Sequence, residues 1–312
     1  MTEHVSAPRI GGIYPPVPTF FHEDESLDLE TQRRHITRLR EKGVTNFVAL
    51  GSNGEAVHLD HDERRAVIAA IREAAGAESQ ILAGAGGQST RETVGLCQLA
   101  AEAGGDVALV LPPSHYGGKM GMAVQRAHFL AVADASPLPV MIYNMPANAA
   151  GVDLDAETVI ALSVHPNIAG VKDSSGNVAK MAEIAAGARE GFTVLAGSAG
   201  FLLPAMVVGA QGAIAALANI APRECLRLVD LFEQGDLAEA RALQARLIPV
   251  NTAVTSGFGV AGLKAALAFT AHYGGEPRRP LAPLGEGERA RLRSLLAQAD
   301  LLNAMRPERA AS

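Results

Sequence analysis

Short apolar segments of β type recur eight times along the chain, and each is followed by an Ala-rich amphipathic segment. They are continuously apolar rather than alternating, which is typical of strands that helices cover on both faces. The β-type segments span residues 13–20, 44–50, 80–83, 106–111, 139–143, 168–171, 193–196 and 213–217. This alternation is the feature that most restricts the fold, because it requires parallel strands joined by crossover helices.

Helical patterns fill the intervals between these segments. They span residues 28–41, 60–76, 90–103, 123–135, 155–163, 178–187 and 201–208. Asp60 with Glu63 three residues later forms a capping box, a signal for a helix start. The sequence therefore predicts an α/β fold, a (β/α)8 TIM barrel over residues 10–222, with a doubly wound open sheet as the alternative.

The β-type segments stop after about residue 222. Helical patterns continue over residues 226–247, 260–272 and 286–303. We therefore predict a second region, residues 223–306, as a helical extension of the barrel.

Charge and hydropathy exclude several classes of function. The net charge is −6, and no segment concentrates lysine and arginine, which argues against nucleic acid or an anionic membrane as a partner. No stretch is apolar over the roughly 18 residues that a membrane span needs, and residues 1–9 lack the apolar run of a signal peptide. A cytoplasmic enzyme is expected.

Lysine is scarce, and Lys172 is the one that stands at the end of a predicted barrel strand. The others are Lys42, Lys119, Lys180 and Lys264. An ordinary surface lysine is the simpler interpretation, but active sites of barrels form at the carboxyl ends of strands. An amine facing the barrel interior is costly unless it is neutral or paired. A neutral, desolvated amine is a nucleophile toward carbonyl carbon, so Lys172 is the candidate for a covalent imine.

Two further segments end at the same edge of the predicted barrel. Tyr143 closes the preceding strand, where its phenol could move protons near Lys172. Ser52 and Asn53 lie in a Gly-Ser-Asn-Gly-Glu loop after the second strand. Their polar groups and the loop N–H groups could bind a carboxylate.

The Gly-Ser-Asn-Gly-Glu, Tyr-Asn-Met-Pro and Gly-Val-Lys-Asp-Ser segments together resemble the dihydrodipicolinate synthase and N-acetylneuraminate lyase family of pyruvate-dependent class I aldolases. The likeness runs over residues 10–284. It implies a barrel with C-terminal helices, usually a homotetramer or at least a dimer, and a carbon–carbon lyase that acts on a small 2-oxo acid without metal or cofactor. Lys172 would form the imine, Tyr143 would shuttle protons, and Ser52 and Asn53 would bind the pyruvate carboxylate, with Ser52 also in the relay.

The family also places a second tyrosine, from a neighbouring subunit, after the fourth strand. Tyr116 is our candidate, and a shift of one residue would put His115 there instead. By the same resemblance, Gly197 and Ile214 would line the pocket at the ends of the last two strands.

Other segments resemble the branch that cleaves 4-hydroxy-2-oxoglutarate to pyruvate and glyoxylate. They span residues 145–148, 165–168, 195–201, 216–219, 251–255 and 273–275. In that branch the position of Ser174 contacts substrate, and Ser198 could help to hold the glyoxylate carboxylate. Dihydrodipicolinate synthases carry an arginine five residues after the shuttle tyrosine. Here Asn148 stands at that position, and it cannot form a charge-assisted fork with a carboxylate.

Several alternatives stay open. The same pyruvate half-site would serve a 2-keto-3-deoxy-sugar-acid aldolase or dehydratase, or a dihydrodipicolinate synthase. An inactive binding protein on the same fold is the non-enzyme alternative. A metal-dependent aldolase would use His58 and His61, although Asp60 between them is assigned to the helix cap. A nucleotide site at the Gly-rich residues 84–89 lacks the spacing of known phosphate loops.

Overall fold

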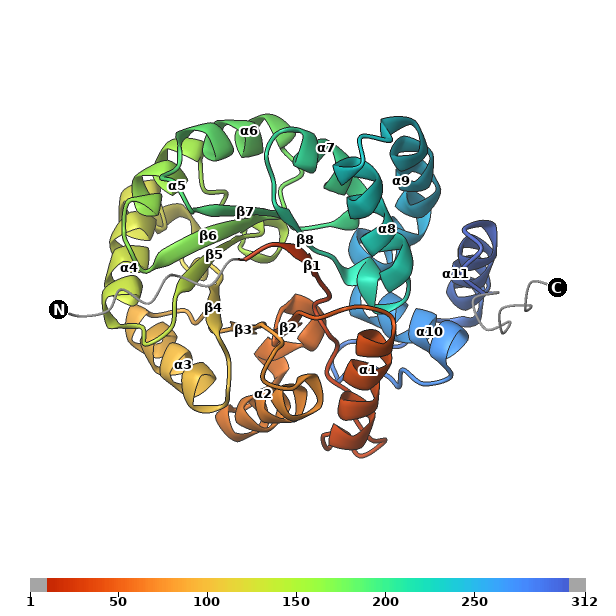
Figure 1. Ribbon diagram of the computed structural model, residues 1–312. Coiled ribbons are helices and arrows are strands. Elements are labelled where there is room, and N and C mark those ends of the chain that lie inside the picture. Colours follow the sequence, from red (N-terminus) through yellow and green to blue (C-terminus); the bar gives the residue numbers. More distant parts are fainter. Residues whose placement is uncertain (1–9, 303–312) are drawn as a thin grey trace.

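The computed structural model describes residues 10–302, and its centre is a barrel of eight parallel strands. Neighbouring strands pair in the order β1-β8-β7-β6-β5-β4-β3-β2, and a parallel bridge between Pro16 and Val48 joins β1 to β2 and closes the sheet (Figure 1). The strands are β1 (Gly12–Tyr14), β2 (Phe47–Ala49), β3 (Ile81–Gly84), β4 (Val107–Val110), β5 (Val140–Asn144), β6 (Ile168–Asp173), β7 (Thr193–Ala196) and β8 (Gly212–Ile214). The predicted barrel is confirmed, and the open sheet is excluded.

A helix follows each strand and covers the outside of the barrel (Figure 1). These helices are α1 (Leu29–Glu41), α2 (His61–Ala75), α3 (Thr90–Glu102), α4 (Met122–Ala135), α5 (Ala156–Ser163), α6 (Val178–Gly187), α7 (Leu202–Val207) and α8 (Pro222–Glu233). The predicted capping box is present: Asp60 accepts from the backbone of Glu63, whose side chain accepts from the backbone of Asp60. Such caps fix where each helix begins, since they satisfy N–H groups that the helix itself leaves free.

Two proline residues shorten the first strand relative to its apolar segment. The segment runs over residues 13–20, but β1 ends at Tyr14, because Pro15 and Pro16 follow and have no N–H for a ladder. At the bridge, Val48 instead donates its N–H to the Pro15 carbonyl, and Val17 donates to the Val48 carbonyl. The barrel thus closes with few hydrogen bonds at this seam.

Three helices of the C-terminal extension lie beside the barrel (Figure 1). They are α9 (Leu237–Thr252), α10 (Gly259–Ala271) and α11 (Glu286–Gln298), and a π-helical turn, Ala253–Gly257, joins α9 to α10. The helical pattern over residues 226–247 is two helices rather than one, since Gly235 has a φ of 78° and Asp236 caps α9. The predicted barrel boundary at Pro222 falls at the start of α8, and residues 303–306 lie outside the described part.

His35 on α1 forms hydrogen bonds with both the extension and the barrel. Its ring is fully buried, and its two nitrogens contact Tyr273 Oη at 2.8 Å and Asn219 Oδ1 at 2.9 Å. Burial lowers the pKa of His35 to about 3, so the ring is neutral at physiological pH. Within residues 10–302, no helix has the length and apolar character needed to cross a membrane.

Candidate active site

Lys172 and Tyr143 lie side by side at the carboxyl ends of β6 and β5. The two residues are register partners in the parallel ladder, so their side chains leave the sheet on the same face. Lys172 is 4% exposed and Tyr143 is 5% exposed. The Lys172 Nζ lies 3.8 Å from the centroid of the Tyr143 ring. The predicted neighbours on adjacent strands are therefore in contact.

Lys172 differs from the other buried lysines in its partners. Lys180 Nζ pairs with Asp153 at 2.6 Å and with Asp173 at 2.9 Å, and Lys264 Nζ pairs with Glu55 at 2.7 Å. An amine held in such an ion pair is occupied by its carboxylate partner and is not free to attack a carbonyl carbon. Among the described residues, no carboxylate pairs with Lys172. Its amine is therefore the buried amine that remains available to a ligand.

A chain of polar side chains leads away from Tyr143. The Tyr143 Oη lies 3.1 Å from Ser52 Oγ, and Asn148 Nδ2 donates to Ser52 Oγ at 3.2 Å. Ser52 begins a short 3-10 turn, Ser52–Gly54, directly after β2, and Asn148 ends another, Pro146–Asn148, after β5. Hydroxyl groups at this spacing can pass a proton from one to the next.

These groups open into a cavity of about 1010 Å³ at the carboxyl ends of the strands. Eight of the residues predicted for the site line it, namely Ser52, Asn53, Tyr143, Asn148, Lys172, Ser174, Gly197 and Ser198. Two do not. Tyr116 is 70% exposed and stacks edge-on against His115, and Ile214 is fully buried among the side chains that fill the barrel interior.

Gly197 is required by the close approach of β6 to β7. A Cβ at this position would lie 1.9 Å from Ser174 Oγ and 2.7 Å from Ser174 Cα. The Gly197 N–H donates to the Asp173 carbonyl at 2.7 Å, which holds the two strand ends together. The Ser174 Oγ is buried and has no hydrogen-bond partner among the described residues, so it is free to bind a ligand.

A polar network that the sequence did not predict lies beside Lys172 and Tyr143, and its members are buried except for the half-exposed Asp153. Asn144 Nδ2 donates to Asp153 at 2.7 Å and to Asp173 at 2.9 Å, and Lys180 pairs with both carboxylates. Burial opposes the charge on Asp153, but the hydrogen bonds from Lys180 and Asn144 lower its pKa below the usual value. Asn144 and Asp173 directly follow Tyr143 and Lys172, so the network fixes both strand ends. Polar residues at the ends of apolar strands were the available signal.

The C-terminal extension supplies one wall of the cavity. Its lining residues include Ile248, Asn251 and Thr252 of α9 and Thr255 and Ser256 of the π-helical turn. Asn251 Nδ2 also donates to Ser198 Oγ at 2.9 Å. No role in the site was predicted for these residues, because the pattern of a surface helix does not reveal what it faces.

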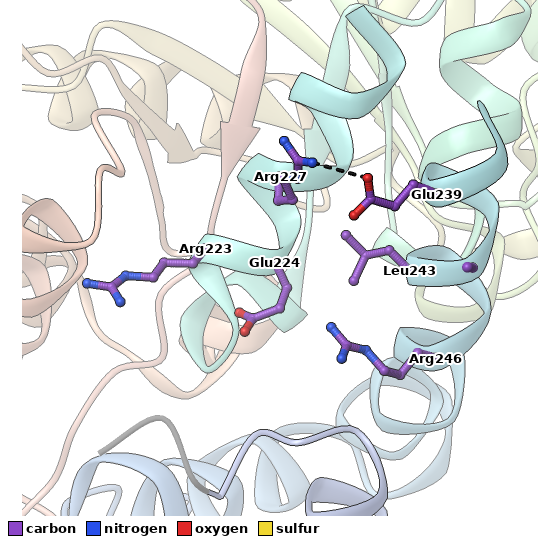
Figure 2. A pocket seen from close by; sticks show the side chains of 7 residues that line it. Arg223, Glu224, Arg227, Glu239, Leu243 and Arg246 are labelled. Carbon is purple, nitrogen blue, oxygen red and sulfur yellow. Dashed lines mark hydrogen bonds and ion pairs between the residues drawn. The ribbon is translucent and has the colours of Figure 1, made fainter. Parts of the chain in front are cut away.

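A second cavity, of about 490 Å³, lies between α8 and α9 and has mixed charge (Figure 2). Figure 2 shows Arg227 reaching Glu239, a pair 3.2 Å apart, with Arg223, Glu224 and Arg246 around it. It contains no buried nucleophile, so the barrel cavity is the candidate active site. Within residues 10–302, no three His, Cys, Asp or Glu side chains gather as metal ligands would, and Asp60 caps α2 as predicted.

Comparison with known proteins places this geometry in a family. A model described as the dihydrodipicolinate synthetase family matches residues 9–299. A protein of Emericella nidulans named "Probable 4-hydroxy-2-oxoglutarate aldolase, mitochondrial" is 43% identical over 93% of this chain and 95% of its own. The L-threo-3-deoxy-hexylosonate aldolase of Hypocrea jecorina is 41% identical over 91% of this chain and 93% of its own.

Solved structures similar to this chain come from the same family. A prophage protein of the dihydrodipicolinic acid synthase family from E. coli K12, in complex with pyruvate, is 33% identical with a TM-score of 0.87, covering 93% of this chain and 99% of its own. Dihydrodipicolinate synthase from Acinetobacter baumannii, also complexed with pyruvate, is 30% identical with a TM-score of 0.88, covering 94% of this chain and 100% of its own. Because the family model spans almost all of the described residues and the relatives match along most of their own length, this chain belongs to the dihydrodipicolinate synthetase family.

Proposed function

We propose that this protein cleaves 4-hydroxy-2-oxoglutarate to pyruvate and glyoxylate through an imine on Lys172. Family membership and the aldolase relatives make it a carbon–carbon lyase of the class I aldolase type. The observation that carries the mechanism is Lys172 itself, a buried amine in contact with the ring of Tyr143 and without a carboxylate partner among residues 10–302.

The reaction begins when Lys172 Nζ attacks the C2 carbonyl carbon of the substrate. A carbinolamine forms and loses water to give a protonated imine, with Tyr143 and Ser52 moving the protons. The C4 hydroxyl then loses its proton and the C3–C4 bond breaks. Its electron pair moves into the imine to give an enamine, and glyoxylate leaves. Protonation of the enamine at C3 and hydrolysis of the imine release pyruvate and restore the amine.

The pyruvate half of the substrate would sit against Ser52 and Asn53, whose polar groups and turn N–H groups can bind its carboxylate. Pyruvate bound to the E. coli prophage protein supports this half of the proposal. The protonated imine serves as the electron sink, so we propose that the reaction uses neither a metal nor an organic cofactor.

The part of the cavity that would bind the aldehyde favours glyoxylate over aspartate semialdehyde. Asn148 stands where a carboxylate-binding arginine would be needed, and it contacts Ser52 instead. Arg64 is the arginine among the described residues that line the cavity, and its guanidinium already donates to the Ala56 and Leu59 carbonyls. The small glyoxylate carboxylate could instead be bound by Asn148, Ser174 and Ser198.

A 3-deoxy-2-oxo sugar acid is the second candidate substrate, and the cavity supports it. A volume of about 1010 Å³ exceeds what the five-carbon substrate needs. Hydroxyl and amide groups of Thr252, Thr255, Ser256 and Asn251 line the wall that the extension supplies, and they could accept the distal hydroxyl groups of a longer chain. The Hypocrea jecorina relative is named for such a substrate.

We also propose a homotetramer, or at least a dimer, in which a neighbouring subunit brings Tyr116 to the relay of this one. The exposure of Tyr116 in the single chain fits this role, with His115 as the alternative. A cytoplasmic location is our prediction, although the Emericella nidulans relative is named as mitochondrial.

Reduction with borohydride in the presence of pyruvate tests the mechanism. We expect intact-mass spectrometry to find one pyruvate-derived adduct per chain and peptide mapping to place it on Lys172. An adduct on Lys180, or none, would contradict the proposal, and the absence of any adduct would favour an inactive binding protein. The kcat/KM values for 4-hydroxy-2-oxoglutarate, 2-keto-3-deoxygluconate and aspartate semialdehyde condensation then decide the substrate.

A further inference from the structure

The turn that carries Ser52 and Asn53 ends at a buried carboxylate. Glu55 adopts a left-handed conformation, with φ of 51°, and its side chain is fully buried. Its Oε1 accepts from Lys264 Nζ at 2.7 Å, and its Oε2 accepts from the backbone N–H of Arg278 at 2.8 Å. A non-glycine residue holds this conformation only where its surroundings fix it. These two donors and the ring nitrogen Nδ1 of His58, which lies 3.3 Å from Oε2, supply that constraint.

Two of these three partners, Lys264 and Arg278, belong to the C-terminal extension, whereas His58 follows β2 of the barrel. Lys264 lies on α10, is 0% exposed, and also donates to the Glu276 carbonyl at 2.9 Å. Arg278 donates through its guanidinium to the His58 carbonyl at 2.8 Å and pairs with Glu63 at 2.7 Å. The extension therefore makes several hydrogen bonds and ion pairs with residues 55–63, which directly follow the turn.

The barrel holds the same turn from its other side. Thr19, in the loop between β1 and α1, donates its hydroxyl to the Gly54 carbonyl at 2.7 Å. At its start the turn presents Ser52, whose Oγ lies 3.1 Å from Tyr143 Oη. Residues 52–55 therefore connect the two contacts: Ser52 lies next to Tyr143, and Glu55 pairs with Lys264 of the extension.

A buried ion pair contributes little to stability, because the desolvation of both charges offsets their attraction. Such a pair does restrict the position of the Glu55 side chain, since each of its two carboxylate oxygens accepts from a donor in a defined direction. We propose that Glu55 and Lys264 are positioning residues, which set Ser52 and Asn53 for the substrate carboxylate and for Tyr143. The C-terminal extension is then part of the catalytic unit. This inference rests on the proposed function.

The experiment measures borohydride trapping of pyruvate as a function of pyruvate concentration, in the full-length protein. The variants are Glu55→Gln and the double variant Glu55→Gln/Lys264→Met, in which no buried charge is left unpaired. We expect the half-saturating pyruvate concentration of the double variant to rise about tenfold or more, equivalent to a loss of one good hydrogen bond. The limiting trapping rate should fall by a smaller factor, because Lys172 lies on another strand.

Asp106→Asn is the matched control. It removes the ion pair with Arg72 at the amino end of β4, the end of the barrel opposite the catalytic residues. We expect it to lower Tm without changing the half-saturating concentration. If the double variant behaves in the same way, the pair is merely structural and the positioning role is wrong.

The experiment also distinguishes two other outcomes: a double variant that does not fold, and a wild-type protein that forms no adduct. Should the double variant fail to fold, Glu55→Gln still tests the inference, since it removes the charge and keeps an acceptor oxygen. An unchanged half-saturating concentration in Glu55→Gln would then overturn it. If the wild-type protein forms no adduct with pyruvate, the proposed function itself fails, and with it any role of Glu55 toward that ligand.

Discussion

Replacement of Gly197 by alanine should disable the active site through backbone displacement alone. The added Cβ would lie 1.9 Å from Ser174 Oγ, about 1.5 Å short of the 3.4 Å at which ordinary van der Waals contact begins. Rotation of the hydroxyl could relieve that clash. It cannot relieve the contact of 2.7 Å with Ser174 Cα, so the backbone must move by about 0.7 Å or more.

That displacement falls beside Lys172, where we propose that the chemistry takes place. Gly197 donates to the Asp173 carbonyl, and Asp173 directly follows Lys172 on β6. A misplacement of about 1 Å between a catalytic group and its substrate can cost roughly 100-fold in rate. We therefore expect Gly197→Ala to lower kcat/KM about 100-fold. Overpacking of this kind typically destabilises a protein by about 1–3 kcal/mol, so the protein should still fold.

A continuous assay of pyruvate release measures the loss of kcat/KM, and thermal unfolding measures the loss of stability separately. Gly95→Ala on α3 is the control, because its added methyl group would meet nothing within 4 Å. It should keep full activity and gain roughly 0.5–1 kcal/mol in helix stability. If Gly197→Ala keeps kcat/KM within about threefold of wild type, a factor too small for such a misplacement, the argument from close approach is wrong.

Further predictions concern the amine, the phenol, pH and metals. Lys172→Ala should lose both turnover and borohydride trapping, as measured by intact mass. Tyr143→Phe keeps the ring beside Lys172 but loses the proton relay, so single-turnover kinetics should show kcat lower by about 100- to 10,000-fold. Because the pKa of His35 is lowered to about 3 in the folded protein, unfolded chains bind an extra proton there between about pH 6.5 and pH 3, and denaturant titrations should show His35 costing about 1.4 kcal/mol of stability per pH unit as the pH falls through that range. A His35→Leu variant should lose this contribution and keep that of His128, whose pKa burial lowers to about 4, whereas a variant at exposed His22 should retain both. EDTA should leave turnover unchanged, and restoration by Zn²⁺ after a loss would favour the metal-dependent alternative.

The sequence predicted the barrel because apolar segments and helix caps are local signals. It also predicted the contact of Tyr143 with Lys172, since consecutive strands of a parallel barrel are neighbours. The break between α8 and α9 was missed because the helical periodicity continues through Gly235.

Other features depend on partners distant in the chain. Glu55 and Lys264 are 209 residues apart, and no local pattern couples them. Ile214 was expected in the pocket, but the position of a strand end along the barrel axis depends on register, and its side chain packs inside the barrel. Tyr116 stays a prediction, because its proposed partner lies on another copy of the chain.

The closure of the barrel at Pro15 and Pro16 also bears on aggregation during folding. Until Val48 pairs with this segment, β1 and β2 are the two open edges of the sheet, and an open edge can recruit a strand from another molecule. The two prolines have no N–H to offer such a strand, so growth of an intermolecular sheet from β1 stops where they begin. The same pair that shortens the first strand therefore protects the nascent barrel until its own seam forms.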